Sequence, residues 1–136
     1  MTDLTQLMRD WLDIVARGPA EAWPDRVADD VVIRLPFAPP GVSNEMRGQA
    51  QAISQLAPVW AAKERFDWRD VVILRTEDPE LVVTTGRSEA VLLSGQTYAN
   101  SYVILTRFRA GKVVEHVEYF NPLPVIEVFR PGPGPG

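Results

Sequence analysis

The chain has 136 residues, of which 46% are hydrophobic and 24% charged, a balance typical of a single globular domain. A formal net charge of -4 and scattered basic residues argue against nucleic-acid binding, because neutralising phosphates requires clustered Lys and Arg. The absence of cysteine excludes disulfides, thiolate chemistry and cysteine zinc sites.

The N-terminal segment predicts an amphipathic helix and no export signal. Apolar residues recur every three or four positions from Leu4 to Val15. Thr2 or Asp3 can cap the start of this helix, and Gly18-Pro19 ends it. The segment lacks a basic region followed by an apolar run, and no apolar run in the chain reaches the length of a membrane span. We therefore expect a cytoplasmic protein that does not interact with membranes.

The next third of the chain predicts short elements separated by prolines. Ala20–Ala28 indicates a short helix, which Pro24 either restarts or breaks. Val31–Leu35 is typical of a strand, and the proline-rich segment Pro36–Asn44 predicts a loop. Apolar spacing over Gln49–Lys63 then favours a longer helix.

The second half of the chain predicts β-structure. Four runs rich in β-branched and aromatic residues are separated by short turn segments, which favours antiparallel hairpins. They are Phe66–Leu74, Leu81–Leu93, Thr97–Arg109 and Val113–Phe120. Gly86 is the expected position of a bulge. Helices followed by a four-stranded meander predict an α+β domain with helices on one sheet face. We expect a single domain over residues 1–130 and a Pro/Gly-rich tail over 131–136.

The last predicted strand mixes apolar and ionisable side chains. Because strand side chains alternate, Val114, His116, Glu118 and Phe120 share one face, and Glu115 lies on the other. Side chains two positions apart are about 7 Å from each other, so His116 and Glu118 can share one ligand. Ionisable groups among apolar neighbours are candidates for a functional site.

Several short motifs occur in a characteristic order along the chain. They are Ala28–Val31 (ADDV), Leu35–Pro39 (LPFAP), Arg47-Gly48, Tyr98–Tyr102 (YANSY), Gly111–Val113 (GKV) and Glu118–Pro122 (EYFNP). Together they resemble the nuclear transport factor 2-like superfamily, in particular its SnoaL-like polyketide cyclase and phenazine-biosynthesis A/B branches. The resemblance implies a cystatin-like cone, in which a curved antiparallel sheet wraps around N-terminal helices. It also implies a ligand pocket in the open end and a homodimer formed through the outer sheet face.

Glu118 is the main catalytic candidate. Phenazine-biosynthesis proteins carry a functional glutamate in an E-[FY]-x-N-P context, and the resemblance carries that role to Glu118 alone. A carboxyl group in an apolar cone is a candidate general acid or base. The alternative is a carboxylate in solvent, or one paired with Arg34 or Arg87.

His116 and Asn100 complete the predicted catalytic set. His116 can orient or protonate a substrate, and its alternative is a half-buried histidine with a backbone partner. Asn100 can donate to a ligand carbonyl, and its alternative is an amide satisfied within the protein. Counting back from a turn at Ala110-Gly111 places Tyr102 roughly opposite Glu118. The same count places Asn100 roughly opposite Phe120.

The predicted substrate-binding residues are aromatic. Tyr98 and Tyr102 offer hydroxyl donors, although for Tyr102 the pattern favours a cross-strand aromatic ladder. Phe120 shares the Glu118 face, Phe37 can cover the pocket as a lid, and Trp60 belongs either to the core or to the pocket wall. A single histidine without cysteine predicts no metal site, and the absence of a phosphate-binding glycine motif predicts no cofactor.

Two functions remain open from the sequence. The first is a cofactor-independent isomerase, cyclase or dehydratase that acts on a mostly apolar or aromatic carbonyl compound. The second is a non-catalytic ligand-binding or dimeric assembly domain. The fold alone does not separate them, because one fold hosts many chemistries.

Overall fold

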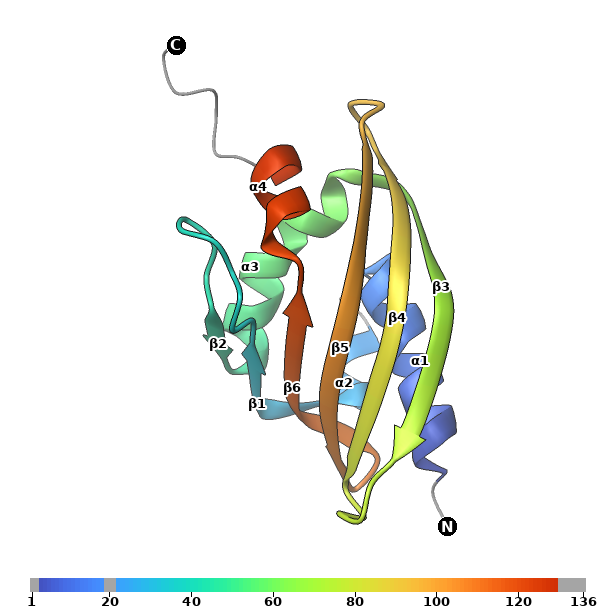
Figure 1. Ribbon diagram of the computed structural model, residues 1–136. Helices are drawn as coiled ribbons and strands as arrows, with labels where there is room; N and C mark the ends of the chain where they lie inside the picture. Colours follow the sequence, from blue (N-terminus) through green and yellow to red (C-terminus); the bar gives the residue numbers. More distant parts are fainter. Residues whose placement is uncertain (1–2, 19–21, 130–136) are drawn as a thin grey trace.

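A strongly curved, open sheet of six strands partly encloses the N-terminal helices (Figure 1). The computed structural model describes residues 3–18 and 22–129, so the predicted tail lies outside the described residues. The helices are α1 (Leu4–Arg17), α2 (Trp23–Arg26), α3 (Gln49–Ala61) and α4 (Pro122–Phe129). The strands are β1 (Val27–Arg34), β2 (Glu45–Arg47), β3 (Lys63–Arg75), β4 (Leu81–Leu92), β5 (Thr97–Arg109) and β6 (Lys112–Phe120). The predicted α+β class and curved sheet are confirmed.

Helix α1 forms as its sequence pattern predicts. The Asp3 carboxylate accepts a hydrogen bond from the Thr5 N–H at 2.9 Å, and this caps the first turn. Gly18 ends the helix in a left-handed conformation with φ of 68°, and its N–H donates to the Ile14 carbonyl. The buried face of the helix consists of Leu4, Met8, Trp11, Leu12 and Ile14. This face packs against the concave side of the sheet and forms one wall of the core (Figure 1).

The β3-β4-β5-β6 meander is antiparallel throughout, as predicted. The bulge lies opposite Gly86 and not at that residue, because two residues of β3 between Arg69 and Val72 have no separate partner on β4. One of them, Asp70, has a positive φ of 54°. A side chain at position 86 would approach Val71 Cγ2 to 3.3 Å, so the glycine leaves room for the bulge.

The sheet is not purely antiparallel, which corrects the prediction. Strand β1 pairs with β6 in parallel and places Ile33 beside His116. A parallel pair joins distant segments without a hairpin, so no turn motif in the sequence predicts it. Strand β1 also begins at Val27, four residues before the predicted start, so α2 ends at Arg26 and the helix expected over Ala20–Ala28 does not reach its predicted end. The first two residues of that expected helix lie outside the described residues. The short strand β2, which pairs with β1, was not predicted at all.

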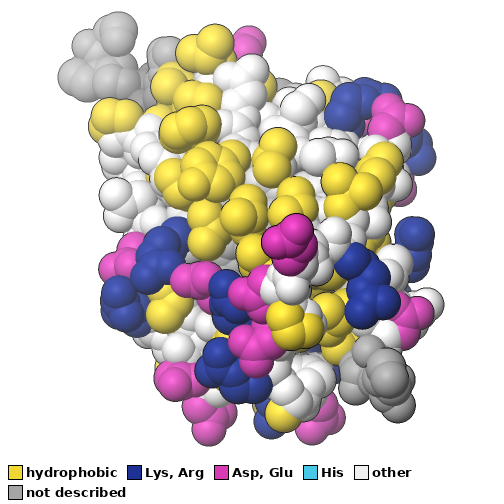
Figure 2. All heavy atoms as spheres, turned by 60° about the horizontal axis from the view of Figure 1, so that its bottom comes forward, with side chains coloured by type: hydrophobic (Ala, Val, Ile, Leu, Met, Phe, Trp, Pro, Cys, Tyr) yellow, Lys and Arg dark blue, Asp and Glu magenta, His cyan; other side chains and the backbone are white. Residues whose placement is uncertain are grey.

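The exposed surface separates charged from apolar regions. Figure 2 shows acidic and basic side chains intermingled over one region and hydrophobic side chains gathered over another. The most exposed large hydrophobic residues on the strands are Val72, Leu74 and Val103, each between 42% and 51% exposed. Within residues 3–18 and 22–129, no helix is long and apolar enough to cross a bilayer.

Candidate functional site

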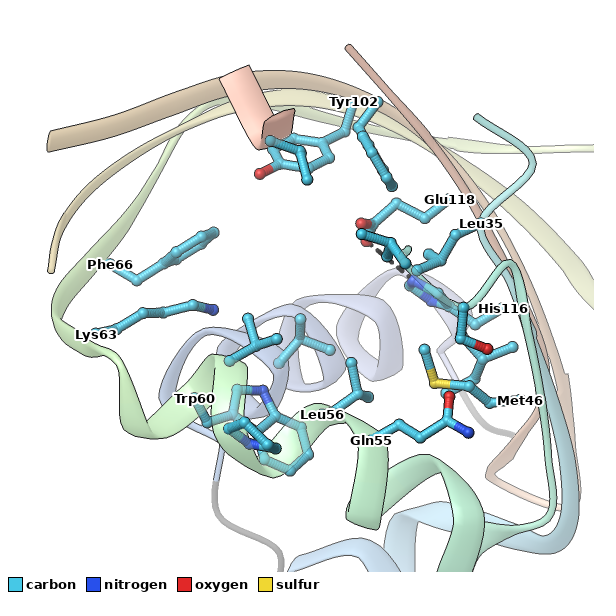
Figure 3. Close-up of a pocket in the computed structure, with 18 of the residues that line it drawn as sticks. Leu35, Met46, Gln55, Leu56, Trp60, Lys63, Phe66, Tyr102, His116 and Glu118 are labelled. Atoms are coloured by element: carbon cyan, nitrogen blue, oxygen red, sulfur yellow. Dashed lines mark hydrogen bonds and ion pairs between the residues drawn. The ribbon is translucent and has the colours of Figure 1, made fainter. Parts of the chain in front are cut away.

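A cavity of about 600 Å³ lies between the concave sheet face and helices α1 and α3 (Figure 3). Its wall is mostly apolar and aromatic, as is usual for small-molecule sites. All four tryptophans line it, namely Trp11, Trp23, Trp60 and Trp68. Polar groups enter from several elements and include Glu118 and His116 of β6, Tyr98 and Tyr102 of β5, Lys63 of β3 and Gln55 of α3.

Edge-to-face aromatic contacts hold the cavity wall in place. Trp23 packs against Trp11 with ring centroids 5.4 Å apart and against Trp60 at 5.6 Å. On the sheet side, Trp68 contacts Phe66 at 5.0 Å and Tyr102 at 5.2 Å. These rings are both core and pocket wall, so the two interpretations of Trp60 are compatible.

Glu118 lies at the end of a hydrogen-bonded chain that begins on α1. The Trp11 indole N–H donates to His116 Nδ1 at 3.0 Å, and His116 Nε2 lies 3.2 Å from Glu118 Oε1. An indole nitrogen is only a donor, so Nδ1 must be unprotonated and the proton of the neutral ring is on Nε2. His116 therefore donates to the Glu118 carboxylate and holds its Oε1.

Glu118 faces the cavity, and among the described residues no lysine or arginine lies within 4.0 Å of its carboxylate. Its side chain is 17% exposed, while that of His116 is 5% exposed. The arginines considered as partners are engaged elsewhere, because Arg34 pairs with Glu45 at 3.1 Å and Arg87 Nε lies 2.8 Å from Asp70. The interpretation of Glu118 as an arginine-paired surface carboxylate is therefore wrong. The expectation that Glu115 lies on the opposite face is confirmed by its ion pair with Arg34.

The two tyrosines of β5 line the cavity as protonated hydroxyl donors. Burial raises the pKa of Tyr102 far above its usual range, with smaller contributions from Tyr98 and the Glu118 charge. Burial also raises the pKa of Tyr98. The Tyr102 hydroxyl lies 2.8 Å from Ser88 Oγ, which fixes the ring against β4. Both hydroxyls retain their protons throughout the physiological pH range, and the two side chains hydrogen-bond each other.

Asn100 is buried but does not line the cavity. Its amide nitrogen donates to the Tyr98 hydroxyl at 2.7 Å and to the Asn121 carbonyl at 2.9 Å. Its amide oxygen accepts from the backbone N–H groups of Ser101 and Asn121. The amide is thus satisfied within the protein, and it orients Tyr98 and ties β5 to the start of α4. The expectation that Asn100 faces the ligand is wrong.

Phe37 also lies away from the cavity. Its ring is 54% exposed and packs edge-to-face on Tyr119, at a centroid distance of 5.2 Å. Tyr119 neighbours Glu118 in the strand and therefore points to the opposite sheet face. The predicted lid role of Phe37 is wrong for this reason, whereas Phe120 lines the cavity as expected.

The register of the last hairpin differs from the count made from its turn. Tyr102 pairs with Phe120, and the residue opposite Glu118 is Ile104. A bulge near Arg107 leaves Val114 without a partner and shifts the pairing. Val113 is consequently the fully buried residue at the start of β6, and the predicted alternation holds only from His116 onward.

Two residues of the site were not singled out from the sequence. Lys63 projects into the cavity from the first position of β3, with Nζ 4.5 Å from the centre of the Phe66 ring (Figure 3). Burial lowers the pKa of Lys63, and the Glu118 charge offsets part of this effect. Trp11 lies on the buried face of α1, and its hydrogen bond to His116 has no local sequence signal. Among the described residues, no group of three or more His, Cys, Asp and Glu side chains is arranged to hold a metal ion.

The sequence matches the SnoaL-like domain model over residues 8–116. The chain belongs to this family. An uncharacterized PhzA/B-like protein of Pseudomonas aeruginosa is 27% identical over 125 residues, which cover 87% of this chain and 84% of that protein.

Solved structures share the fold. A Bacillus subtilis protein proposed to be an isomerase superposes with a TM-score of 0.82 at 20% identity, covering 92% of this chain and 91% of that one. The Δ5-3-ketosteroid isomerase from a Mycobacterium species gives a TM-score of 0.72 at 18% identity, covering 86% of this chain and 92% of that one. These similarities agree with the nuclear transport factor 2-like fold expected from the sequence.

Proposed function

We propose that the protein is a cofactor-independent enzyme that isomerises, cyclises or dehydrates a mostly apolar carbonyl compound, with Glu118 as its general acid and base. The observation that carries this proposal is the Glu118 carboxylate in a largely apolar cavity, bound by the neutral imidazole of His116. A general base must reach its substrate, and Glu118 is exposed to the cavity. The ketosteroid isomerase fold neighbour supports this class of chemistry by analogy.

The proposed first step is removal of a proton from the carbon next to a carbonyl group. Glu118 Oε2 takes the proton, because Oε1 is engaged by His116. The C–H bonding electrons form a carbon–carbon double bond, and the carbonyl π electrons move to the oxygen. The hydroxyl of Tyr98 or Tyr102 stabilises the resulting oxyanion by hydrogen bonding. Glu118 then returns the proton to another carbon, which completes an isomerisation with no net change in atoms or charge.

A proton-exchange assay tests this role of Glu118 directly. In D2O, the wild-type protein is expected to accelerate deuterium incorporation next to the carbonyl of 2-tetralone, followed by NMR. Glu118→Gln keeps the shape but removes the base, so the rate should fall by about 100-fold or more. Glu115→Gln is the matched control, since it changes the same residue type on the opposite face of β6. An unchanged rate in Glu118→Gln would remove the main residue of the proposal.

The alternative is a binding or assembly domain without catalysis. It is favoured if 2-tetralone binds but the wild-type protein does not accelerate exchange.

The half-exposed Val72, Leu74 and Val103 support a homodimer through the outer sheet face under either function. Light scattering after gel filtration should give twice the chain mass of 15.2 kDa, and a monomer at micromolar concentration would contradict this arrangement. A cytoplasmic location remains a prediction.

A further inference from the structure

Lys63 is a basic group directed into the cavity. It begins β3 directly after helix α3, and its side chain points inward past Phe66 (Figure 3). The ammonium group contacts the Phe66 ring face, with Nζ 4.5 Å from the ring centre. Among the described residues, no carboxylate lies within 4.0 Å of this ammonium group.

Several arginines of the protein are arranged differently from Lys63. Arg34, Arg87 and Arg107 all hold carboxylate partners on the surface. Lys63 is half-buried and loses water without gaining such a partner, which is why burial lowers its pKa. A charge in an apolar site is costly unless a counter-charge is supplied.

We propose that Lys63 binds a carboxylate of the ligand, so that the cavity selects apolar or aromatic acids with the anionic end at β3. This inference rests on the proposed function and specifies its substrate class. Lys63 and Glu118 enter from β3 and β6, which are separated by two strands in the curved sheet. A ligand carboxylate is attracted by the ammonium group and repelled by Glu118, and this fixes one orientation. The uncharged part of the ligand then lies toward Glu118, where the carbonyl chemistry takes place.

Two fluorescent probes with the same ring system test the inference. Anthracene-9-carboxylate and 9-anthracenemethanol differ mainly in charge, and both suit an aromatic cavity of about 600 Å³. The wild-type protein should bind the carboxylate about tenfold more tightly than the alcohol in fluorescence titrations at low salt. Lys63→Met should abolish this preference while retaining the alcohol, and Lys63→Arg should keep much of it. Lys112→Met, which removes the same charge from an exposed position on β6, should leave the preference intact.

The outcomes separate the two proposals. If both probes bind the wild-type protein equally, the anion site is wrong and the apolar cavity of the proposed function stands. If the carboxylate preference survives in Lys63→Met, another group binds the anion and the inference is overturned. If neither probe binds, small-molecule binding in the cavity fails and both proposals fall together.

Discussion

Replacing Trp11 with phenylalanine removes one hydrogen-bond donor from the series of hydrogen bonds that links Trp11 through His116 to Glu118. The indole N–H is the group that occupies His116 Nδ1, at 3.0 Å. Phenylalanine keeps an aromatic ring next to Trp23 but has no N–H. The variant therefore separates the packing of the cavity wall from the control of the imidazole.

The expected loss of stability follows from the burial of this hydrogen bond. The His116 side chain is only 5% exposed, so water cannot readily replace the lost donor. A buried acceptor without a partner costs about 1–3 kcal/mol, and the smaller ring adds a cavity cost of similar sign. Urea unfolding should show this decrease in the free energy of unfolding. Trp68→Phe is the matched control, because its indole N–H donates at 2.9 Å to the Leu12 carbonyl and not to a histidine.

The imidazole itself provides the decisive measurement. The chain has one histidine, so its ring nitrogens can be assigned in a 15N NMR spectrum without ambiguity. The wild-type protein should show an unprotonated Nδ1 and a protonated Nε2. In Trp11→Phe the Nδ1 signal should move further from that of a protonated nitrogen, because Nδ1 loses its hydrogen bond, while Trp68→Phe should leave it in place. A wild-type proton on Nδ1, or an unchanged signal in Trp11→Phe, would refute the assigned direction of the hydrogen-bonded chain.

Three further predictions concern stability. Gly18→Ala should lower the free energy of unfolding by about 2–4 kcal/mol in urea titrations. The new Cβ would lie 2.3 Å from Trp60 Cγ, and the residue has a positive φ of 68°. An unchanged free energy of unfolding would contradict this packing. Asn100→Ala should cost about 2 kcal/mol, since it removes two partly buried hydrogen bonds to the Asn121 backbone and a buried one to the Tyr98 hydroxyl. Hydrogen exchange should show earlier opening of α4, and unchanged exchange would argue against the link between Asn100 and this helix. Lys63→Met should stabilise the protein near pH 7. Burial lowers the folded-state pKa of this lysine, so the free energy of unfolding of the wild type rises with pH up to the unfolded-state pKa. The difference in free energy of unfolding between the variant and the wild type should therefore shrink toward pH 10. A difference independent of pH would show that charge burial is not its cause.

Local patterns in the sequence were sufficient for most of the elements. The helical spacing of α1, the Pro-rich loop and the turn residues between the last four strands each act over a few positions, and the structure follows them. The parallel pairing of β1 with β6 depends on segments about 80 residues apart in the chain. No turn motif or hydrophobic periodicity in the sequence predicts such a pair. The same limit applies to strand register, where the closing pair of the turn and a bulge near Arg107 each move the partner of Glu118 by one residue from the predicted Tyr102.

The candidate site shows the same division between local and distant information. The alternation of β6 correctly brings His116 and Glu118 to one face, and both line the cavity. Lys63 looked like an ordinary helix-end residue, because its inward direction depends on how β3 curves over the cavity. Phe37 looked like a lid from its loop, but packing on Tyr119 holds it on the outer face. Side-chain direction in loops and at strand ends is set by tertiary contacts that short patterns do not contain.

The polar groups in the cavity divide into two kinds that suit one substrate orientation. His116 and Tyr102 are each held by a partner in the wall, Trp11 and Ser88 respectively, so their geometry exists before a ligand arrives. Preorganised donors contribute most to catalysis when charge develops next to them during the reaction. Lys63, in contrast, has a flexible side chain that contacts the Phe66 ring, and among the described residues no carboxylate lies within 4.0 Å of its ammonium group, which suits binding of an anionic ligand group. The two proposals together therefore place the chemistry at the β6 end of the cavity and ligand recognition at the β3 end.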